Sequence, residues 1–302
     1  MHIITSVSEM QHYSDKTRIN GNKIAVVPTM GYLHEGHLSL IRLAKQHCDV
    51  VITTIFVNPA QFSPGEDFEK YPRDLNRDIS MCTSAGCDVV FAPDVAAMYN
   101  HNFLTFVSVD NITNKLEGTS RPTHFKGVTT VVAKLFNITK PHVAVFGQKD
   151  AQQAAVIKIM VKDLNFDIQL IVGQTIREAD GLAMSSRNIY LTNGERKDAS
   201  VLYKSLKLAE EEIINGVNSV EIIKAKMIDL ILSKPNFIID YISFNDADTL
   251  EELGAIAETP VLVSLAARIG KVRLIDNLVT EVTQKSHSER SEESETSNSG
   301  YF

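Results

Sequence analysis

The sequence predicts an α/β protein with a mostly parallel sheet and helices on both faces, followed by a smaller α+β domain. In the first half of the chain, short β-branched runs alternate with helix-like stretches, and such alternation is typical of parallel strands joined by crossover helices. In the second half, helix-like stretches come first and short strands follow. We place the domain boundary near residue 176, with the first domain at 1–175 and the second at 176–282.

The elements of the first domain follow from short apolar runs and from apolar residues at helical spacing. Strands are expected at 24–27, 50–57, 88–92, 143–146 and 168–172. Helices are expected behind the first strand, where Leu38, Ile41 and Ala44 form a stripe, and at 72–85 and 151–164. In such folds ligands bind at the carboxyl ends of the strands.

The second domain begins with a capping box, in which Thr192 and Glu195 satisfy each other's free amides at a helix start. Apolar residues then continue at helical spacing to a stop at Gly216, which predicts one helix. A second helix is expected at 220–232, and strands at 238–244, 261–267 and 272–275. The last 20 residues, 283–302, contain six Ser, four Glu and no aliphatic residue, so we expect them to be disordered.

Composition and charge narrow the class of protein. The 302 residues carry a net charge of −7, which argues against a nucleic-acid partner, because such partners need a positive face. No apolar run approaches the ~18 residues that span a bilayer, and the N-terminus does not resemble a secretory signal. Cys48, Cys82 and Cys87 form neither an even disulfide set nor a zinc pattern. A reducing, cytoplasmic location is expected.

The strongest local motif is the segment 28–37, between the first strand and its helix. Gly31 permits a tight turn, and His34 and His37, three residues apart, can point at one spot at a helix start that favours anions. The segment therefore predicts a phosphate site. The alternative is that the two histidines occur there by chance. A metal site is not expected, because the His-Glu-x-x-His pattern needs a spacing of four and His34 and His37 are three apart.

Three further segments carry polar groups at predicted strand ends or loops. Lys149 and Asp150 suit a phosphate and a ribose, with Gln153 one turn further on. Ser185, Ser186 and Arg187 suit the outer phosphates of a nucleotide. For each, a solvated polar loop remains the alternative. Neither a P-loop, a dinucleotide fingerprint nor a nucleophile elbow occurs.

Amides and a basic loop complete the set of candidates. Asn58 and Gln61 follow the second strand, and their amide side chains can form hydrogen bonds with a carboxylate or with hydroxyls without adding charge. Arg121 and His124 could pair with a carboxylate or phosphate, or form a solvated basic loop. Together these groups indicate a phosphate-binding enzyme without an evident covalent nucleophile.

The order of VPTMGYLHEGH, IFVNPAQF, FGQKDAQQ and READGLAMSSRN resembles that of the pantoate–β-alanine ligases, from about residue 3 to 280. That family belongs to the nucleotidyltransferases with a His-x-Gly-His signature. The resemblance implies a Rossmann-like ATP- and pantoate-binding domain, a C-terminal lid domain, a homodimer, and ATP used with Mg²⁺. One departure is Thr123, where the family usually has Gly, and this could alter the geometry of Arg121.

The resemblance also implies roles for individual residues. His37, His34, Lys149 and Arg187 would be catalytic. The substrates pantoate and β-alanine would be bound by Gln61, Gln153, Asn58 and Arg121. ATP would be bound by Met30, Gly31, Tyr32, Leu33, His34, Glu35, Gly36, His37, Gly147, Gln148, Lys149, Asp150, Ile176, Met184, Ser185, Ser186 and Arg187.

The implied reaction is the ATP-dependent condensation of pantoate with β-alanine through a pantoyl-adenylate, releasing AMP and pyrophosphate. Two other functions remain open from the residues alone. A nucleotidyltransferase that adenylates a phosphate would want further basic residues in place of Gln61 and Gln153. A non-catalytic nucleotide-binding regulator would bind ATP without releasing pyrophosphate.

Overall fold

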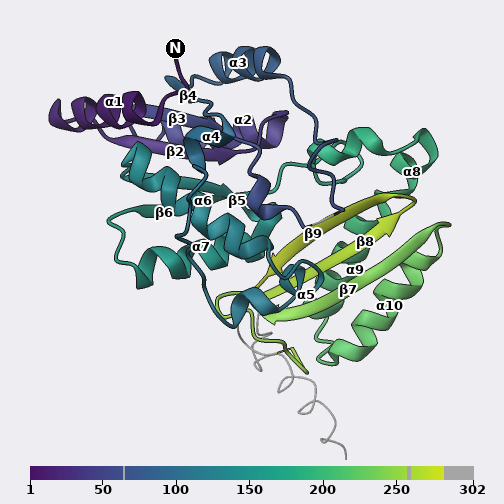
Figure 1. The fold of residues 1–302 in the computed structure, drawn as a ribbon. Helices are drawn as coiled ribbons and strands as arrows, with labels where there is room; N and C mark the ends of the chain where they lie inside the picture. The colour runs from purple at the N-terminus through teal and green to yellow at the C-terminus, as the bar shows by residue number, and fades with distance from the viewer. Residues whose placement is uncertain (64, 257–259, 282–302) are drawn as a thin grey trace, which may run out of the picture.

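The computed structural model describes residues 1–63, 65–256 and 260–281, and its first part is a six-stranded sheet (Figure 1). The order is β1-β4-β3-β2-β5-β6, and all neighbouring strands are parallel. The strands are β1 His2–Ile4, β2 Ile24–Thr29, β3 Val50–Ile55, β4 Val89–Phe91, β5 Val143–Gly147 and β6 Gln169–Gly173. The predicted parallel sheet is confirmed.

Helices cover both faces of this sheet, as predicted. They are α1 Val7–Ile19, α2 Glu35–Lys45, α3 Leu75–Ser84, α6 His124–Thr139 and α7 Ala151–Asp163. Side chains alternate along β2, so Ile24 and Val26 pack with α1, α6 and α7, while Ala25 and Val27 pack with α2 and α3. Buried on both faces, the central strand is apolar throughout its first four residues, as parallel strands usually are.

The direction in which strands are added reverses beside β2. The chain proceeds from β2 through β3 to β4 on one side, then returns to place β5 and β6 on the other. Between β2 and β5 the loops therefore leave in opposite directions, and a crevice opens at the carboxyl ends of the two strands. The segments 28–37 and 146–150 both begin there.

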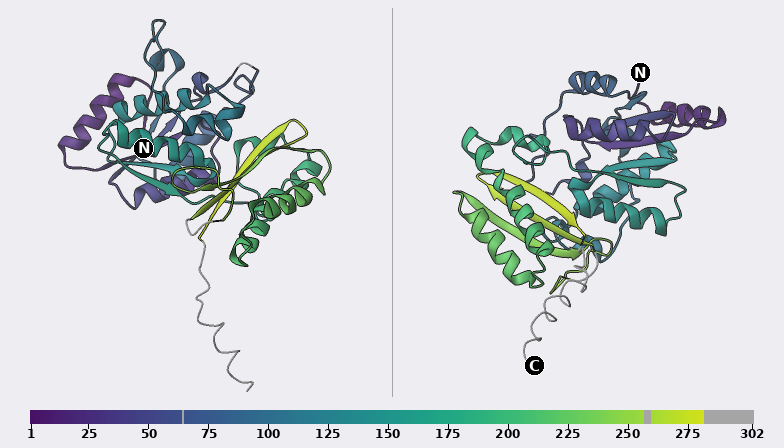
Figure 2. Two further views of the ribbon diagram at one scale, coloured as in Figure 1. Left: turned by 90° about the horizontal axis from the view of Figure 1, so that it is seen from below. Right: turned by 180° about the vertical axis from the view of Figure 1, so that it is seen from behind.

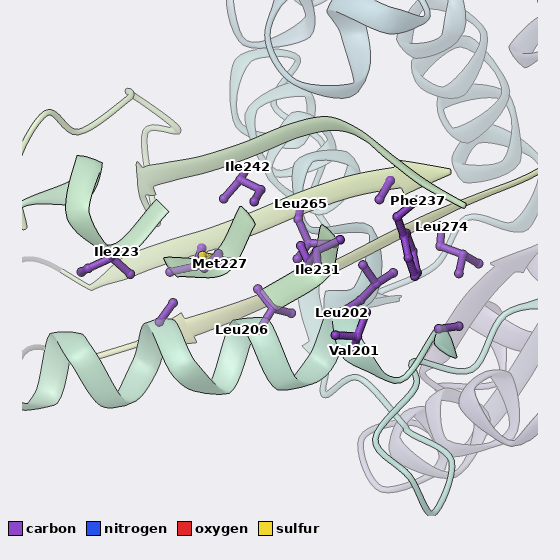
Figure 3. Close-up of a cluster of buried hydrophobic side chains, with 14 of the residues drawn as sticks. Val201, Leu202, Leu206, Ile223, Met227, Ile231, Phe237, Ile242, Leu265 and Leu274 are labelled. Carbon is purple, nitrogen blue, oxygen red and sulfur yellow. The ribbon is translucent and has the colours of Figure 1, made fainter. Parts of the chain in front are cut away.

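The second part is a three-stranded antiparallel sheet, β7-β8-β9, which forms a separate lobe with three helices (Figure 2). Its elements are α8 Asn193–Asp198, α9 Val201–Ile214, α10 Val220–Leu232, β7 Phe237–Asp246, β8 Val261–Ile269 and β9 Val272–Thr280. Leu202 and Leu206 of α9, and Met227 and Ile231 of α10, pack against the sheet residues Ile242 and Leu265 in one core (Figure 3). The predicted smaller α+β unit is confirmed.

Short elements connect the longer ones, several of them at the carboxyl edge of the large sheet. They are η1 Pro59–Gln61, α4 Val95–Met98, η2 Ile112–Asn114, α5 Glu117–Ser120, η3 Gln148–Asp150 and η4 Ser186–Tyr190. No helix in the described ranges has the length and apolar character needed to cross a bilayer.

Some boundaries differ from the prediction. The capping box at Thr192 is present, but the single helix expected from there to Gly216 is wrong, because the chain breaks at Ala199 and Ser200 into α8 and α9. Neither β1, α1 nor α6 was predicted. Buried over most of its surface, α6 has only a narrow polar stripe, formed by Lys126, Lys134 and Asn137, and this is a weak signal of helical spacing. The tail expected to be disordered at 283–302 lies outside the described residues.

Candidate active site

A cavity of about 1080 Å³ lies at the crevice between β2 and β5 and extends to the second sheet. Most of the predicted site residues line it, although they come from five separate segments. The lining includes Met30, His34, Gly36, His37, Gln61, Arg121, Gly147, Lys149, Asp150, Gln153, Ile176, Met184, Ser185, Ser186 and Arg187.

The other predicted site residues do not line the cavity: Gly31, Tyr32, Leu33, Glu35, Gln148 and Asn58. Gly31, with a φ of +84°, makes the turn that leads from β2 into α2. The turn is held by Asp78, whose two carboxylate oxygens accept from the amides of Tyr32 at 2.7 Å and Leu33 at 2.8 Å. Asp78 thus shapes the motif from a distant helix, and nothing in the local sequence marks it.

His34 and His37 stand together, with ring centroids 4.1 Å apart. Burial, helped by the positive charge of Lys149, lowers the pKa of His34 to about 4. Burial, and then the nearby His34 and Lys149, hold the pKa of His37 well below its usual value. Both rings are therefore neutral at pH 7.

The hydrogen bond between the two residues fixes the tautomer of His37. Its Nδ1 accepts from the His34 amide at 3.2 Å, so the proton of the neutral ring must be on Nε2. The buried Nδ1 of His34 has no hydrogen-bond partner among the described residues. The pair can therefore offer a neutral N–H donor to an anion in the cavity.

Gln61 is positioned by contacts around both its side chain and its backbone. Asn58 Nδ2 donates to Gln61 Oε1 at 3.1 Å, and Gln61 Nε2 donates to the Met30 sulfur at 2.9 Å. His124 Nδ1 lies 2.9 Å from the Gln61 carbonyl oxygen, to which Arg121 Nη2 also donates at 3.1 Å. Asn58 and His124 therefore act as supports for Gln61.

A pH-dependent loss of stability is expected from His124. Burial, and then the charge of Arg121, lower its pKa to about 4, whereas an unfolded histidine has a pKa near 6.5. Between these values the unfolded chain binds a proton that the folded chain does not, so the free energy of unfolding falls as pH falls from about 6.5 toward 4.

The effect of His124 can be isolated with His124→Asn, which keeps a donor for the Gln61 carbonyl but does not titrate. The loss in unfolding free energy between pH 7 and pH 5 should be about 2 kcal/mol smaller in this variant, at 1.36 kcal/mol per pKa unit. Urea denaturation at the two pH values measures it. Equal losses in the variant and the parent chain would contradict the assignment.

Lys149 is held by the second sheet. Asn277 of β9 donates through Nδ2 to the carbonyl oxygens of Gln148 at 3.0 Å and Lys149 at 2.8 Å, and accepts from Gln148 Nε2 at 3.1 Å. These bonds fix the η3 turn, from which Lys149 faces the cavity. Gln148 is thus a structural link between the two parts.

The loop 184–187 contacts the first part of the protein at two points. Ser186 Oγ donates to the Tyr32 carbonyl at 3.1 Å, and Ser185 Oγ accepts from the Arg187 amide at 3.3 Å. Arg187 forms two parallel hydrogen bonds with Asp67, at 2.8 Å and 2.9 Å. The loop therefore faces the same cavity as the paired histidines.

The sequence interpretation missed several residues at this site. Glu66, Asp67, Tyr71 and Glu117 line the cavity, and Asn277 supports Lys149. None lies in the quoted motifs, and acidic side chains are not expected in a phosphate site. Their closeness to the arginines depends on the tertiary fold alone.

The fold and site define a class of α/β enzyme that binds a nucleotide at the switch point of a parallel sheet, with basic and neutral donors facing one cavity. Residues 2–279 match the model of the pantoate-beta-alanine ligase family. A pantothenate synthetase from Thermoanaerobacter sp. (strain X514) is 54% identical over 279 residues, covering 92% of this chain and 98% of the relative.

Solved structures agree with this match. Pantothenate synthetase from Thermus thermophilus superposes with a TM-score of 0.86 at 41% identity, over 92% of this chain and 99% of that one. The Francisella tularensis pantoate-beta-alanine ligase, complexed with beta-gamma ATP and beta-alanine, superposes with a TM-score of 0.77 at 37% identity. This match covers 92% of this chain and 97% of that one. The chain belongs to the pantoate–β-alanine ligase family. It joins pantoate to β-alanine in an ATP-dependent reaction that forms pantothenate.

Proposed function

We propose that the cavity carries out both half-reactions, with the phosphates of ATP bound by His34, His37, Lys149 and Arg187. The supporting observation is that three segments far apart in the sequence bring these side chains to one cavity. The carboxylate of pantoate attacks the α-phosphorus and pyrophosphate leaves. The amine of β-alanine then attacks the mixed anhydride, and AMP leaves.

The proposed catalytic contribution is positioning and stabilisation of negative charge. A carboxylate has no adequate leaving group until its oxygen is joined to phosphate. The Nε2 proton of His37 is directed by the bond at Nδ1, and a preorganised donor of this kind is worth about 2.7–4 kcal/mol at the transition state. Lys149 and Arg187 each add a full positive charge. The neutral imidazoles of the two histidines do not repel these charges.

Pantoate is proposed to bind beside Gln61, Gln153 and Arg121. Val128, Val131 and Val132 of α6 form an apolar part of the cavity wall, which suits the two methyl groups of pantoate. Gln61 is already held by Asn58 and Met30, so less ordering is required when the substrate binds. Asn58 is proposed to act on the substrate through Gln61.

Mg²⁺ is proposed to enter with ATP. In the described residues no group of three or more His, Cys, Asp or Glu could hold a metal ion. Mg²⁺ at nucleotide sites commonly keeps its waters and is bound mainly through the phosphates, so the lining fits an ion carried by the substrate. When bound, it would neutralise part of the triphosphate charge.

The two sheets are proposed to be separate domains, 1–175 and 176–282, with the second serving as a lid over the cavity. A homodimer is also proposed. Leu104 and Phe106 are 87% and 48% exposed on a segment that runs beside α6, and such exposed apolar groups favour a partner surface. Sedimentation of the full chain tests the dimer. A cytoplasmic location is supported by the free, buried Cys48, Cys82 and Cys87.

A single assay tests the proposed chemistry: incubation with ATP, Mg²⁺, pantoate and β-alanine, following AMP and pyrophosphate separately. Pyrophosphate formation with pantoate alone, and AMP release only after β-alanine is added, are expected. ATP binding without pyrophosphate release would favour the regulator, and adenylation of a phosphate acceptor in place of pantoate would favour the other nucleotidyltransferase.

Replacing Ser185 and Ser186 together with alanine should weaken ATP binding about 100-fold or more, and pantoate binding by much less. Each hydroxyl removed from a charged phosphate costs about 1.5–3 kcal/mol. Titration calorimetry with a non-hydrolysable ATP analogue and, separately, with pantoate measures the difference. Equal losses for the two ligands would count against the phosphate assignment.

A further inference from the structure

Both Arg121 and Arg187, the arginines that the site proposal uses, are paired with neighbouring carboxylates of one segment. This acidic segment, residues 65–71, lies between η1 and α3. Glu66 accepts from Arg121 Nε at 2.8 Å and from Nη2 at 2.7 Å. Asp67 accepts from Arg187 Nε at 2.8 Å and from Nη2 at 2.9 Å. Each guanidinium therefore already binds an anion that belongs to the protein itself.

Asp67 occupies the Nε/Nη2 edge of Arg187, one of the two edges through which a guanidinium can bind a phosphate. A guanidinium binds carboxylates and phosphates through the same fork of parallel N–H groups, so one fork cannot hold both at once. Burial raises the pKa of Asp67, but the hydrogen bonds and charge of Arg187 outweigh it and hold the pKa below its usual value. Asp67 is consequently a charged competitor at neutral pH.

A second contact keeps the competitor close. Tyr190, three residues after Arg187, donates its hydroxyl to the Lys70 carbonyl at 2.7 Å, and the Arg187 guanidinium lies 5.9 Å from the centre of the Tyr71 ring. The acidic segment and η4 are thus joined by further contacts next to the ion pair. If a phosphate displaced Asp67, these contacts would keep the carboxylate near enough to return.

We propose that Asp67 is an internal counter-anion that competes with phosphates for Arg187 and so weakens the hold on pyrophosphate, assisting its departure after adenylation. The proposal depends on the phosphate role of Arg187 given above. The exchange of one anion for another leaves the guanidinium paired at each stage, which avoids the large cost of a desolvated, unpaired charge. Asp67 is in this sense a positioning residue that acts through Arg187.

The test is Asp67→Asn in the full chain, titrated with inorganic pyrophosphate in the calorimeter at fixed, low ionic strength. Removal of the competing charge should tighten pyrophosphate binding about tenfold. Product inhibition by pyrophosphate in the steady state should strengthen in parallel. A purely structural role for Asp67 predicts the opposite, because a displaced loop would weaken binding.

Two further variants complete the test. Glu66→Gln removes the neighbouring charge, which pairs with Arg121, and should change pyrophosphate affinity by less than about twofold. Arg187→Gln should weaken pyrophosphate binding, and in its presence Asp67→Asn should have no further effect. If Arg187→Gln leaves binding unchanged, the phosphate role of Arg187 fails. If it weakens binding but Asp67→Asn does not tighten it, the counter-anion proposal alone is overturned.

Discussion

Replacing His37 with alanine should lower the rate of pyrophosphate release about 100- to 1,000-fold, the loss that follows removal of one preorganised donor to developing negative charge. The side chain is half-buried beside His34 and Lys149, with its Nδ1 committed to the His34 amide. The Nε2–H is thus directed without a charge that would have to be desolvated. Loss of the hydrogen bond from the His34 amide costs only about 1 kcal/mol of folding free energy, so the fold should remain.

Single-turnover measurement of pyrophosphate release with ATP and pantoate tests this expectation. A suitable control is His47→Ala, because His47 is exposed just beyond the end of the same helix and lies outside the cavity lining. It should keep the full rate. A His37→Ala protein with native circular dichroism and undiminished release would remove this residue from the mechanism.

Gly127→Ala should impair both stability and pantoate binding. Gly127 lies in the second turn of α6, where the helix meets η1, and an added Cβ would lie 2.2 Å from the Ala60 carbonyl oxygen and 2.6 Å from the Gln61 nitrogen. Both are backbone atoms, so the helix and η1 must separate. Such overpacking costs about 1–3 kcal/mol or more.

Gln61 would move with η1, and the Asn58 bond to the Gly127 carbonyl would be lost. Because Gln61 is the proposed pantoate ligand, an increase in the KM for pantoate is expected, and a displacement of about 1 Å can also reduce turnover about 100-fold. Gly194→Ala is the matched control, since nothing lies within 4 Å of its added Cβ. Equal effects of the two substitutions on urea midpoint and KM would contradict this account.

Much of this site could be predicted from the sequence, because its core lies in short segments directly after strands. The carboxyl ends of parallel strands share one edge, so His37 after β2 and Lys149 after β5 were expected to meet. Confirmation of the parallel order places both on one cavity. Residues whose geometry is set within a turn, such as Gly31, could also be predicted from the local sequence.

The remaining parts depend on contacts that no local pattern records. Asp78 holds the Gly31 turn from a helix more than forty residues away, and Asp67 approaches Arg187 over a separation of 120 residues. The α6 helix is rich in Thr and Val, which favour strands, and its polar stripe is limited to Lys126, Lys134 and Asn137, so its helical spacing is easily missed in the sequence. The break between α8 and α9 contains neither Gly nor Pro, and therefore gave no signal.

The bonds from Asn277 to the η3 turn have a consequence for any shortened form of the chain. A fragment cut near residue 176 would retain the whole parallel sheet and both histidines, yet the peptide carbonyls of Gln148 and Lys149 would lose their donor. The ammonium group of Lys149 would then be free to sample many orientations. The terminal sheet in this respect supports the turn that carries Lys149, a residue proposed above to bind phosphate.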